Sequence, residues 1–352
     1  MNGVEDFASR TIDEVTHAPV QLPEMPEGCW PGAILGGAAG LALFLYEAAA
    51  RRERPDLGRL ARRWLELART DRDMKPGFIA GAAGIEAVAA IGGLYADRSD
   101  EVLAAARALD AIAARPMAAE LYEGAAGIAW AARMLLARIP EPQAEARAIL
   151  HRVRDRMLDT VLAAYAQPLA PAPHAMLGMA HGVAGELWTL VAMLGANHAT
   201  VYARLEDLAG LRMADPDDLL YWPPMLGADP ERGDFNSFCN GMAGHTILWC
   251  EVARQLRDED TLDLARQAAA TTVALDGAVH SLCCGLAGQA IALAKVAELF
   301  DDAALANTAD ERMQLAMVDA TRTTTKRMGL WWGATGLTLA AWSRSRMPCF
   351  ES

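Results

Sequence analysis

The fold is decided by a pair of glycines that opens an apolar run, Gly37-Ala-Ala-Gly40 followed by Leu41-Ala-Leu-Phe-Leu-Tyr46. The steps between the first glycines of successive pairs are 44, 43, 58, 59, 44 and 48 residues. Self-similarity at such a period is typical of repeat architectures. The other six pairs are Gly81-Ala-Ala-Gly84, Gly124-Ala-Ala-Gly127, Gly182-Val-Ala-Gly185, Gly241-Met-Ala-Gly244, Gly285-Leu-Ala-Gly288 and Gly333-Ala-Thr-Gly336. We number the repeats one to seven by these pairs.

Each repeat is expected to hold two helices. The mostly apolar residues after each pair predict a helix that is buried nearly all round. The segments between pairs are amphipathic, as in residues 56–70, where Leu57, Leu60, Trp64 and Leu67 follow helical spacing. Seven such hairpins predict an all-α fold, an (α/α)7 toroid with the glycine pairs at the inner-helix starts. We expect the glycines to permit close approach of the inner helices. An open solenoid is the alternative, but it would leave one face of the inner helices wet.

Composition limits the other possibilities. With 53% hydrophobic and 22% charged residues, the chain is neither disordered nor a small stapled scaffold. A net charge of −13 argues against nucleic-acid binding. The apolar runs are short or carry polar residues, so buried helices are favoured over membrane spans. We expect one domain over residues 1–352, with residues 1–27 as an irregular extension. The N-terminus shows no secretory signal, and the few cysteines indicate a reduced, cytoplasmic protein.

Polar residues gather just before the first glycine of four repeats. Glu120 precedes the pair of repeat three, His181 that of repeat four, Cys239 that of repeat five, and Cys283 with Cys284 that of repeat six. Because the repeats are equivalent, these side chains should meet at one end of the ring. Three cysteines with an open fourth position describe a catalytic zinc site. Adjacent cysteines share one ion only from an irregular turn, so ordinary burial of one or both stays an alternative.

The remaining candidates have two interpretations each. His181 is an acid/base group or a core histidine, and Glu120 is catalytic or a helix cap. The two longest intervals between glycine pairs contain proline-rich loops at residues 167–176 and 214–238. These loops lead directly to the candidate site residues His181 and Cys239. Tyr221 and Trp222 in the second loop form a substrate rim or pin the loop to the ring. Further open cases are the structural or ligand-supporting His245 and His280, and Trp331-Trp332, which is packing or a substrate platform.

Together these motifs resemble a known family. The sevenfold glycine array, Ala180-His-Gly182, Cys239-Asn-Gly241 and Cys283-Cys-Gly285 are similar to the lanthionine synthetase C-like (LanC-like) cyclases, in their Cys-Cys-Gly zinc-motif subset. The resemblance runs from Gly37 to Glu351. It implies an α/α toroid with zinc at its mouth, held by Cys239, Cys283 and Cys284, and His181 as the acid/base group. The chain departs from the common family pattern at three positions, having Cys284 in place of His, Glu120 in place of Asp and Phe235 in place of Arg.

The activity that the resemblance implies is Michael-type addition of peptide cysteines to dehydroalanine or dehydrobutyrine, which closes thioether rings. Zinc would favour the thiolate, which is the attacking species. The expected partners are a dehydrated precursor peptide and a separate dehydratase or kinase/lyase enzyme. Two alternatives stay open: a LanC-like protein that adds glutathione or another small thiol, and a non-catalytic toroid that binds a peptide or partner enzyme. A glycosidase on this scaffold is disfavoured, since that chemistry wants paired carboxylates.

Overall fold

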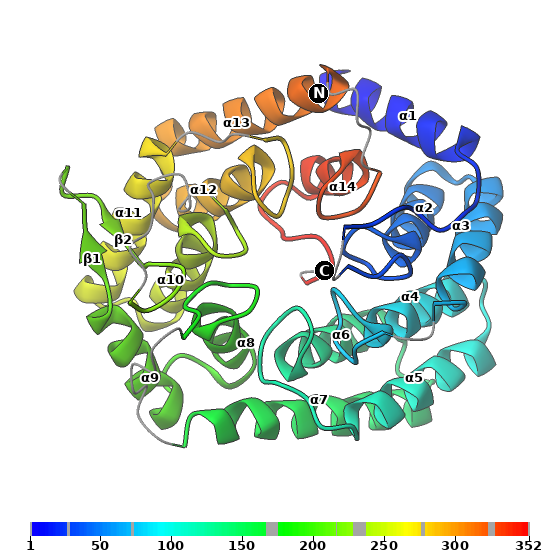
Figure 1. Cartoon of the computed structure of the whole chain (residues 1–352), viewed down its shortest axis with the longest axis horizontal. Helices are drawn as coiled ribbons and strands as arrows, with labels where there is room; N and C mark the ends of the chain where they lie inside the picture. The colour runs from blue at the N-terminus through cyan, green and yellow to red at the C-terminus, as the bar shows by residue number, and fades with distance from the viewer. Residues whose placement is uncertain are drawn as a thin grey trace.

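The computed structural model describes residues 2–26, 29–71, 74–166, 175–215, 217–227, 237–275, 279–322 and 328–350. Over these residues the chain is all-α, with two concentric rings of helices around one axis (Figure 1). The inner helices are α2 (Ala38–Arg52), α4 (Ala82–Tyr95), α6 (Ala125–Arg138), α8 (Val183–Leu194), α10 (Met242–Leu256), α12 (Leu286–Phe300) and α14 (Ala334–Ser343). The outer helices are α1 (Asn2–His17), α3 (Pro55–Ala68), α5 (Ser99–Ala113), α7 (Ala144–Ala164), α9 (Ala199–Gly210), α11 (Glu259–Ala274) and α13 (Ala303–Arg322).

A continuous circle of backbone hydrogen bonds closes the toroid. In every repeat the residue two places before the first glycine, here position −2, donates its N–H to the carbonyl of position −2 in the next repeat, and repeat seven donates to repeat one. The seven donor–acceptor distances lie between 2.7 and 3.2 Å. The predicted closed ring is therefore confirmed. The residues at position −2 are Leu35, Ile79, Tyr122, Ala180, Cys239, Cys283 and Trp331.

The glycine pairs stand at the inner-helix starts as predicted, but for a more local reason than expected. The first glycine of each pair is the N-cap of its helix. At the second glycine, a side chain would collide with the turn that leads into the same helix. A Cβ atom on Gly127 would lie 2.1 Å from the carbonyl oxygen of Leu121, whereas the nearest atom of a neighbouring repeat, Phe78 Cβ, would be 3.1 Å away. The glycines thus shape the tight turns that bear the site residues.

The N-terminal helix corrects the expectation of an irregular extension at residues 1–27. Residues 2–17 form α1, which packs on α14 and occupies the outer ring between α13 and α3 (Figure 1). Its buried face includes Phe7, Ile12 and Val15, and Glu5 forms an ion pair with Arg52 of α2. Helix α1 is therefore the outer helix of the seventh hairpin, supplied from the other end of the chain.

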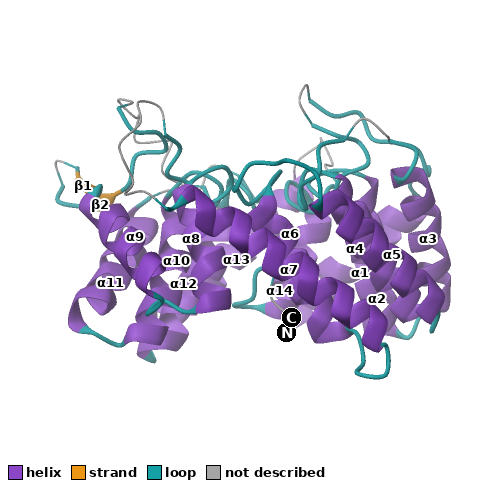
Figure 2. Cartoon of the chain, turned by 90° about the horizontal axis from the view of Figure 1, so that it is seen from below, coloured by secondary structure: helices purple, strands orange, loops and turns teal. Residues whose placement is uncertain are grey.

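The two ends of the toroid differ. The turns before the inner helices and the longer loops lie at one end, the mouth (Figure 2), and β1 (Met213–Ala214) pairs antiparallel with β2 (Leu220–Tyr221) in the second proline-rich loop. From the other end the C-terminal segment enters the axis, where Phe350 lies 5.3–5.9 Å, centroid to centroid, from Phe78, Trp130, Trp188 and Trp331. No described helix is long and apolar enough to cross a bilayer.

Candidate metal centre

Three cysteine thiols meet at the mouth. The Sγ atoms of Cys239, Cys283 and Cys284 all lie within 4.8 Å of one another, and Cys239 Sγ is 3.8 Å from Cys284 Sγ. Cys283 is buried, Cys239 is half-buried and Cys284 is exposed. The cluster therefore has a buried side in the axis and an open side toward the mouth.

The turns before α10 and α12 explain how these thiols converge. Cys239 and Cys283 are neighbours in the backbone circle, since the N–H of Cys239 donates to the carbonyl of Cys283 over 3.2 Å. We call the residue directly before the first glycine position −1. In both repeats, the backbone N–H of position −1 donates a hydrogen bond to the hydroxyl of a serine that lies four places before the first glycine. These bonds join Asn240 N to Ser237 Oγ at 3.1 Å and Cys284 N to Ser281 Oγ at 3.2 Å. Cys283 and Cys284 therefore lie in an irregular turn. Such a turn is the condition for two adjacent cysteines to reach one ion.

The donor set fits a zinc ion. Two sulfurs bound to tetrahedral zinc at about 2.3 Å lie about 3.8 Å apart, close to the Cys239–Cys284 separation and far from the roughly 2.05 Å of a disulfide. Hydrogen bonds from Cys283 and Cys284 lower the pKa of Cys239 well below its ordinary value. The contact with Cys239 is the main cause that raises the pKa of Cys283 and that brings the pKa of Cys284 to about 12. A bound cation would favour the thiolate form of all three cysteines.

A histidine–carboxylate pair stands beside the thiols. His181 Nδ1 lies 2.7 Å from Glu120 Oε2, and the carboxylate also accepts backbone N–H bonds from Tyr122 and Glu123. Glu120 therefore both caps its turn and orients the imidazole, which leaves Nε2 as the nitrogen for proton exchange. The hydrogen bond to Glu120 is the main cause that raises the pKa of His181, against the opposing effect of burial.

Tyr122 joins the two halves of the site and was not singled out from the sequence. Its hydroxyl donates to Cys283 Sγ over 3.7 Å, and its ring lies 5.4 Å from that of His181 in an edge-on arrangement. The side chain is buried, with the Trp331 ring 5.6 Å away. The repeat alignment could have identified it. Tyr122 occupies position −2 in repeat three, the same position that Cys239 and Cys283 occupy in repeats five and six.

The comparisons with known proteins agree with this architecture. The family described as lanthionine synthetase C-like protein matches residues 30–342. The chain belongs to the LanC-like family. Among solved structures, nisin cyclase is similar in fold with a TM-score of 0.71 and 15% sequence identity, over 98% of this chain and 94% of that chain. No curated protein matches the sequence.

In this LanC-like chain, one of the two predicted rim residues is wrongly assigned. Trp222 is completely buried, its ring stacks on His245 at 4.7 Å, and its Nε1–H donates to the carbonyl of Leu208 over 2.7 Å. It therefore pins the loop to the ring and offers no surface to a peptide. Tyr221 is half-buried in β2. Most of the first proline-rich loop, and Phe235, lie outside the described residues.

The structure assigns different environments to Trp331, Trp332, His245 and His280. Trp331 is buried in the axis, whereas Trp332 is half-buried at the mouth. His280 Nδ1 lies 2.9 Å from Asp319 Oδ2 of α13 and ties its turn to the outer ring. His245 is fully buried, and neither ring nitrogen has a hydrogen-bond partner among the described residues. Neither histidine belongs to the described thiol cluster.

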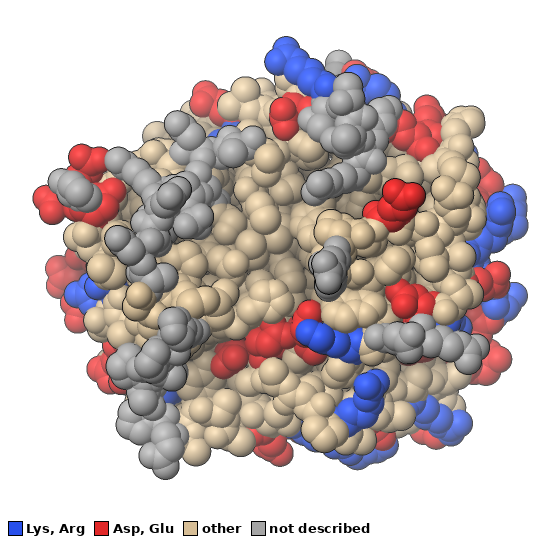
Figure 3. All heavy atoms as spheres, viewed as in Figure 1, with Lys and Arg blue, Asp and Glu red and all other residues tan. Residues whose placement is uncertain are grey.

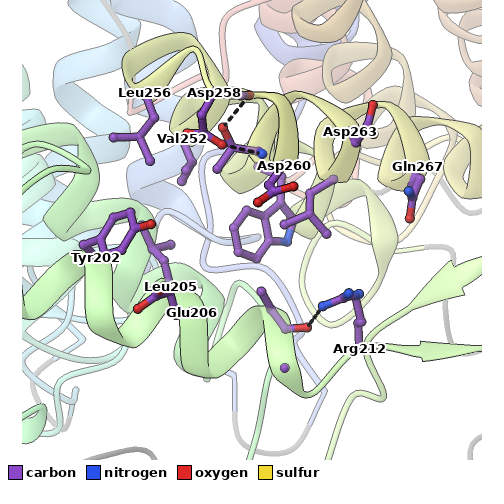
Figure 4. Close-up of a pocket in the computed structure, with 15 residues that line it drawn as sticks. Tyr202, Leu205, Glu206, Arg212, Val252, Leu256, Asp258, Asp260, Asp263 and Gln267 are labelled. Carbon is purple, nitrogen blue, oxygen red and sulfur yellow. Dashed lines mark hydrogen bonds between the residues drawn. The ribbon is translucent and has the colours of Figure 1, made fainter.

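The mouth of the toroid is hollowed at its surface (Figure 3). The hollow at its centre is lined mostly by uncharged residues, and charged side chains lie at its edge and around the perimeter (Figure 3). A cavity of about 510 Å³ lies instead on the outer wall between α9, α10 and α11 (Figure 4). There Asp258 accepts from Thr261 N, and Arg212 donates to the carbonyl of Ala209. That cavity contains none of the predicted site residues, so we place the chemistry at the mouth.

Proposed function

We propose that this LanC-like protein is a zinc-dependent lanthipeptide cyclase. The observation that supports the proposal most is the convergence of three cysteine thiols, open on one side, with a histidine–carboxylate pair. Cys239, Cys283 and Cys284 would hold the ion. When bound, zinc would lower the pKa of a substrate thiol and leave it nucleophilic at neutral pH.

The protein's own residues would handle the proton. The substrate thiol loses its proton to solvent. Its sulfur then forms a bond to the β carbon of dehydroalanine or dehydrobutyrine, and the electrons of the double bond pass to the enolate. His181, kept as imidazolium by Glu120, gives a proton to the α carbon of that enolate. The half-exposed ring of His181 is accessible from the mouth, whereas the buried Glu120 acts by positioning it and holding its charge.

The setting follows from this chemistry. The substrate would be a peptide already dehydrated by a separate enzyme, a dehydratase or a kinase/lyase. A reducing compartment, the cytoplasm, would keep both the substrate thiol and the site thiols free. All six cysteines of the chain are free in the structure.

The test is ring closure by purified, zinc-loaded protein on a synthetic peptide that carries one dehydroalanine and one cysteine. Cyclisation leaves the mass unchanged, so it is read as resistance of the product to thiol alkylation, followed by mass spectrometry. We expect Cys239→Ala to lose both zinc and activity, and Cys250→Ala, at a buried cysteine outside the cluster, to keep both. His181→Ala should keep zinc and lose about 10²-fold or more in rate.

Three results would contradict the proposal in different ways. Zinc retained by Cys239→Ala would remove the metal site as drawn. A peptide whose mass increases when glutathione is supplied, with no ring product, would indicate small-thiol addition. Tight peptide binding without loss of the free thiol would indicate a binding module.

A further inference from the structure

A second cavity lies at the mouth, against the turns of repeats one and seven, and the proposed mechanism does not use it. It has a volume of about 500 Å³, within the range of preformed ligand sites. Residues 19–26 form one wall, and the turns of repeats one and seven with the upper parts of α2 and α3 form the others. Its apolar lining includes Met25, Leu41, Trp64, Met328 and Trp332.

The backbone circle places this cavity relative to the thiols. Trp332, at position −1 of repeat seven, follows Trp331, whose carbonyl accepts the N–H of Cys283 over 3.1 Å. Trp331 N–H in turn donates to Leu35, which precedes Gly36, over 2.8 Å. The residues at position −1 of repeats six, seven and one are therefore neighbours around the mouth, in the order Cys284, Trp332 and Gly36. His181 lies on the other side of Cys284, two repeats away.

The cavity is built from restrained parts. A Cβ atom at Gly36 would come within 2.8 Å of Met25 Cε and 3.0 Å of Trp332 Cε3, so the glycine leaves room for both side chains. Leu41 and Trp64 form the inner wall and are 2% and 1% exposed. Three prolines in the wall segment, Pro19, Pro23 and Pro26, limit its backbone freedom. Such a wall loses little entropy when a side chain docks.

We propose that this cavity binds an apolar or aromatic side chain next to the reacting cysteine of the substrate peptide. The inference rests on the proposed function, because the thiol at the cysteine cluster anchors the peptide. The alkene must lie toward His181, which protonates the enolate. A residue on the other side of the cysteine then reaches Trp332 and Gly36. The cavity would thus select the residue that is adjacent to the substrate cysteine on the side that does not become part of the ring.

The experiment measures binding without chemistry. The probes are acetylated synthetic pentapeptides with one cysteine and no dehydrated residue, carrying Gly or Phe immediately before or after the cysteine. Calorimetry on the zinc-loaded protein should show Phe binding about 10- to 100-fold more tightly than Gly on one side of the cysteine, as expected for burial of one aromatic side chain. Matched peptides with serine in place of cysteine lack the anchor, so they should bind more weakly and should no longer distinguish Phe before the serine from Phe after it.

Two variants locate the effect. Met25→Trp fills the cavity and Trp332→Ala removes a wall, so each should reduce the Phe/Gly ratio to about twofold or less. Leu315→Trp, at an exposed position of α13, is the control and should keep the full ratio. Melting temperatures identify any variant that is misfolded, and the other variant then decides.

The outcomes separate the two proposals. Equal affinities of the Gly and Phe peptides on both sides, or a ratio that survives both variants, would overturn the cavity assignment. A protein that cyclises Gly-flanked and Phe-flanked peptides equally well would keep the proposed function and lose the cavity. A protein that prefers Phe but closes no ring would keep the cavity and lose the proposed function.

Discussion

Replacing His245 by phenylalanine tests how the buried side of the ring responds to pH. Burial lowers the pKa of His245 to about 3, against about 6.5 for an exposed histidine. Between these two values the unfolded chain binds a proton that the native chain does not, so the free energy of unfolding falls as pH falls. At up to about 1.36 kcal/mol for each pH unit, this residue alone should cost about 2 kcal/mol between pH 7 and pH 5.

The His245→Phe variant should remove that loss. Phenylalanine keeps a flat ring against Trp222, whose centroid lies 4.7 Å away with an interplanar angle of 11°. It also removes two buried nitrogens that have no partner among the described residues. An unsatisfied buried polar group costs about 1–3 kcal/mol, so the variant should be more stable than the parent by about that amount even at pH 7.

Urea unfolding of both proteins at pH 7, 6 and 5, followed by tryptophan fluorescence, measures the difference. The advantage of the variant should grow by about 2 kcal/mol between pH 7 and pH 5. Zinc-free protein is used throughout, so that acid release of metal does not contribute. His151→Phe, at an exposed histidine of α7, is the control. Curves for parent and variant that stay parallel over this range would refute the buried neutral imidazole.

Four further changes test the site and the loop beside it. Glu120→Gln should let the pKa of His181 fall toward its ordinary value, so the alkaline decline of the cyclisation rate, where the imidazolium is lost, moves to lower pH while zinc content is kept; an unmoved pH–rate profile would contradict the pairing. Tyr122→Phe should weaken zinc binding about tenfold through loss of the hydroxyl bond to the thiol, as measured by chelator competition, and unchanged affinity would show that this bond is idle. Trp222→Ala should lower stability by about 3–5 kcal/mol, or about 4–7 °C in Tm for 352 residues unfolding cooperatively, with peptide affinity kept. Tyr221→Ala should instead weaken peptide binding with little change in Tm, and the reverse pattern would end its assignment to the rim.

The convergence of the thiols with His181 and Glu120 could be predicted because it needs only the equivalence of the repeats. Once the glycine pairs are aligned, residues just before them share one end of any ring. The finer division between positions −2 and −1 could not be predicted. It depends on the path of a tight turn, which sends Tyr122 into the axis and leaves Cys284 exposed.

Two misassignments have identifiable physical causes. Helix α1 carries no glycine pair, and its partner α14 lies at the opposite end of the chain, so counting periods could not join them. Trp222 follows Tyr221 in a loop, where aromatic residues suggest a binding surface. Its burial depends on His245, which lies in the next inner helix and supplies a flat ring for it to stack on. Neither pairing leaves a periodic trace in the sequence.

The backbone circle explains why one scaffold can hold both a cluster of thiols and an apolar axis. Each residue at position −2 donates and accepts a main-chain hydrogen bond to its two neighbours, so its place is independent of its side chain. Leu35 and Trp331 place buried apolar side chains at this position, whereas Cys239 and Cys283 place thiols there. Ligands held this way need no further loop to order them, and preorganisation of this kind is what a catalytic site requires. Chemistry can then be altered one repeat at a time without opening the ring.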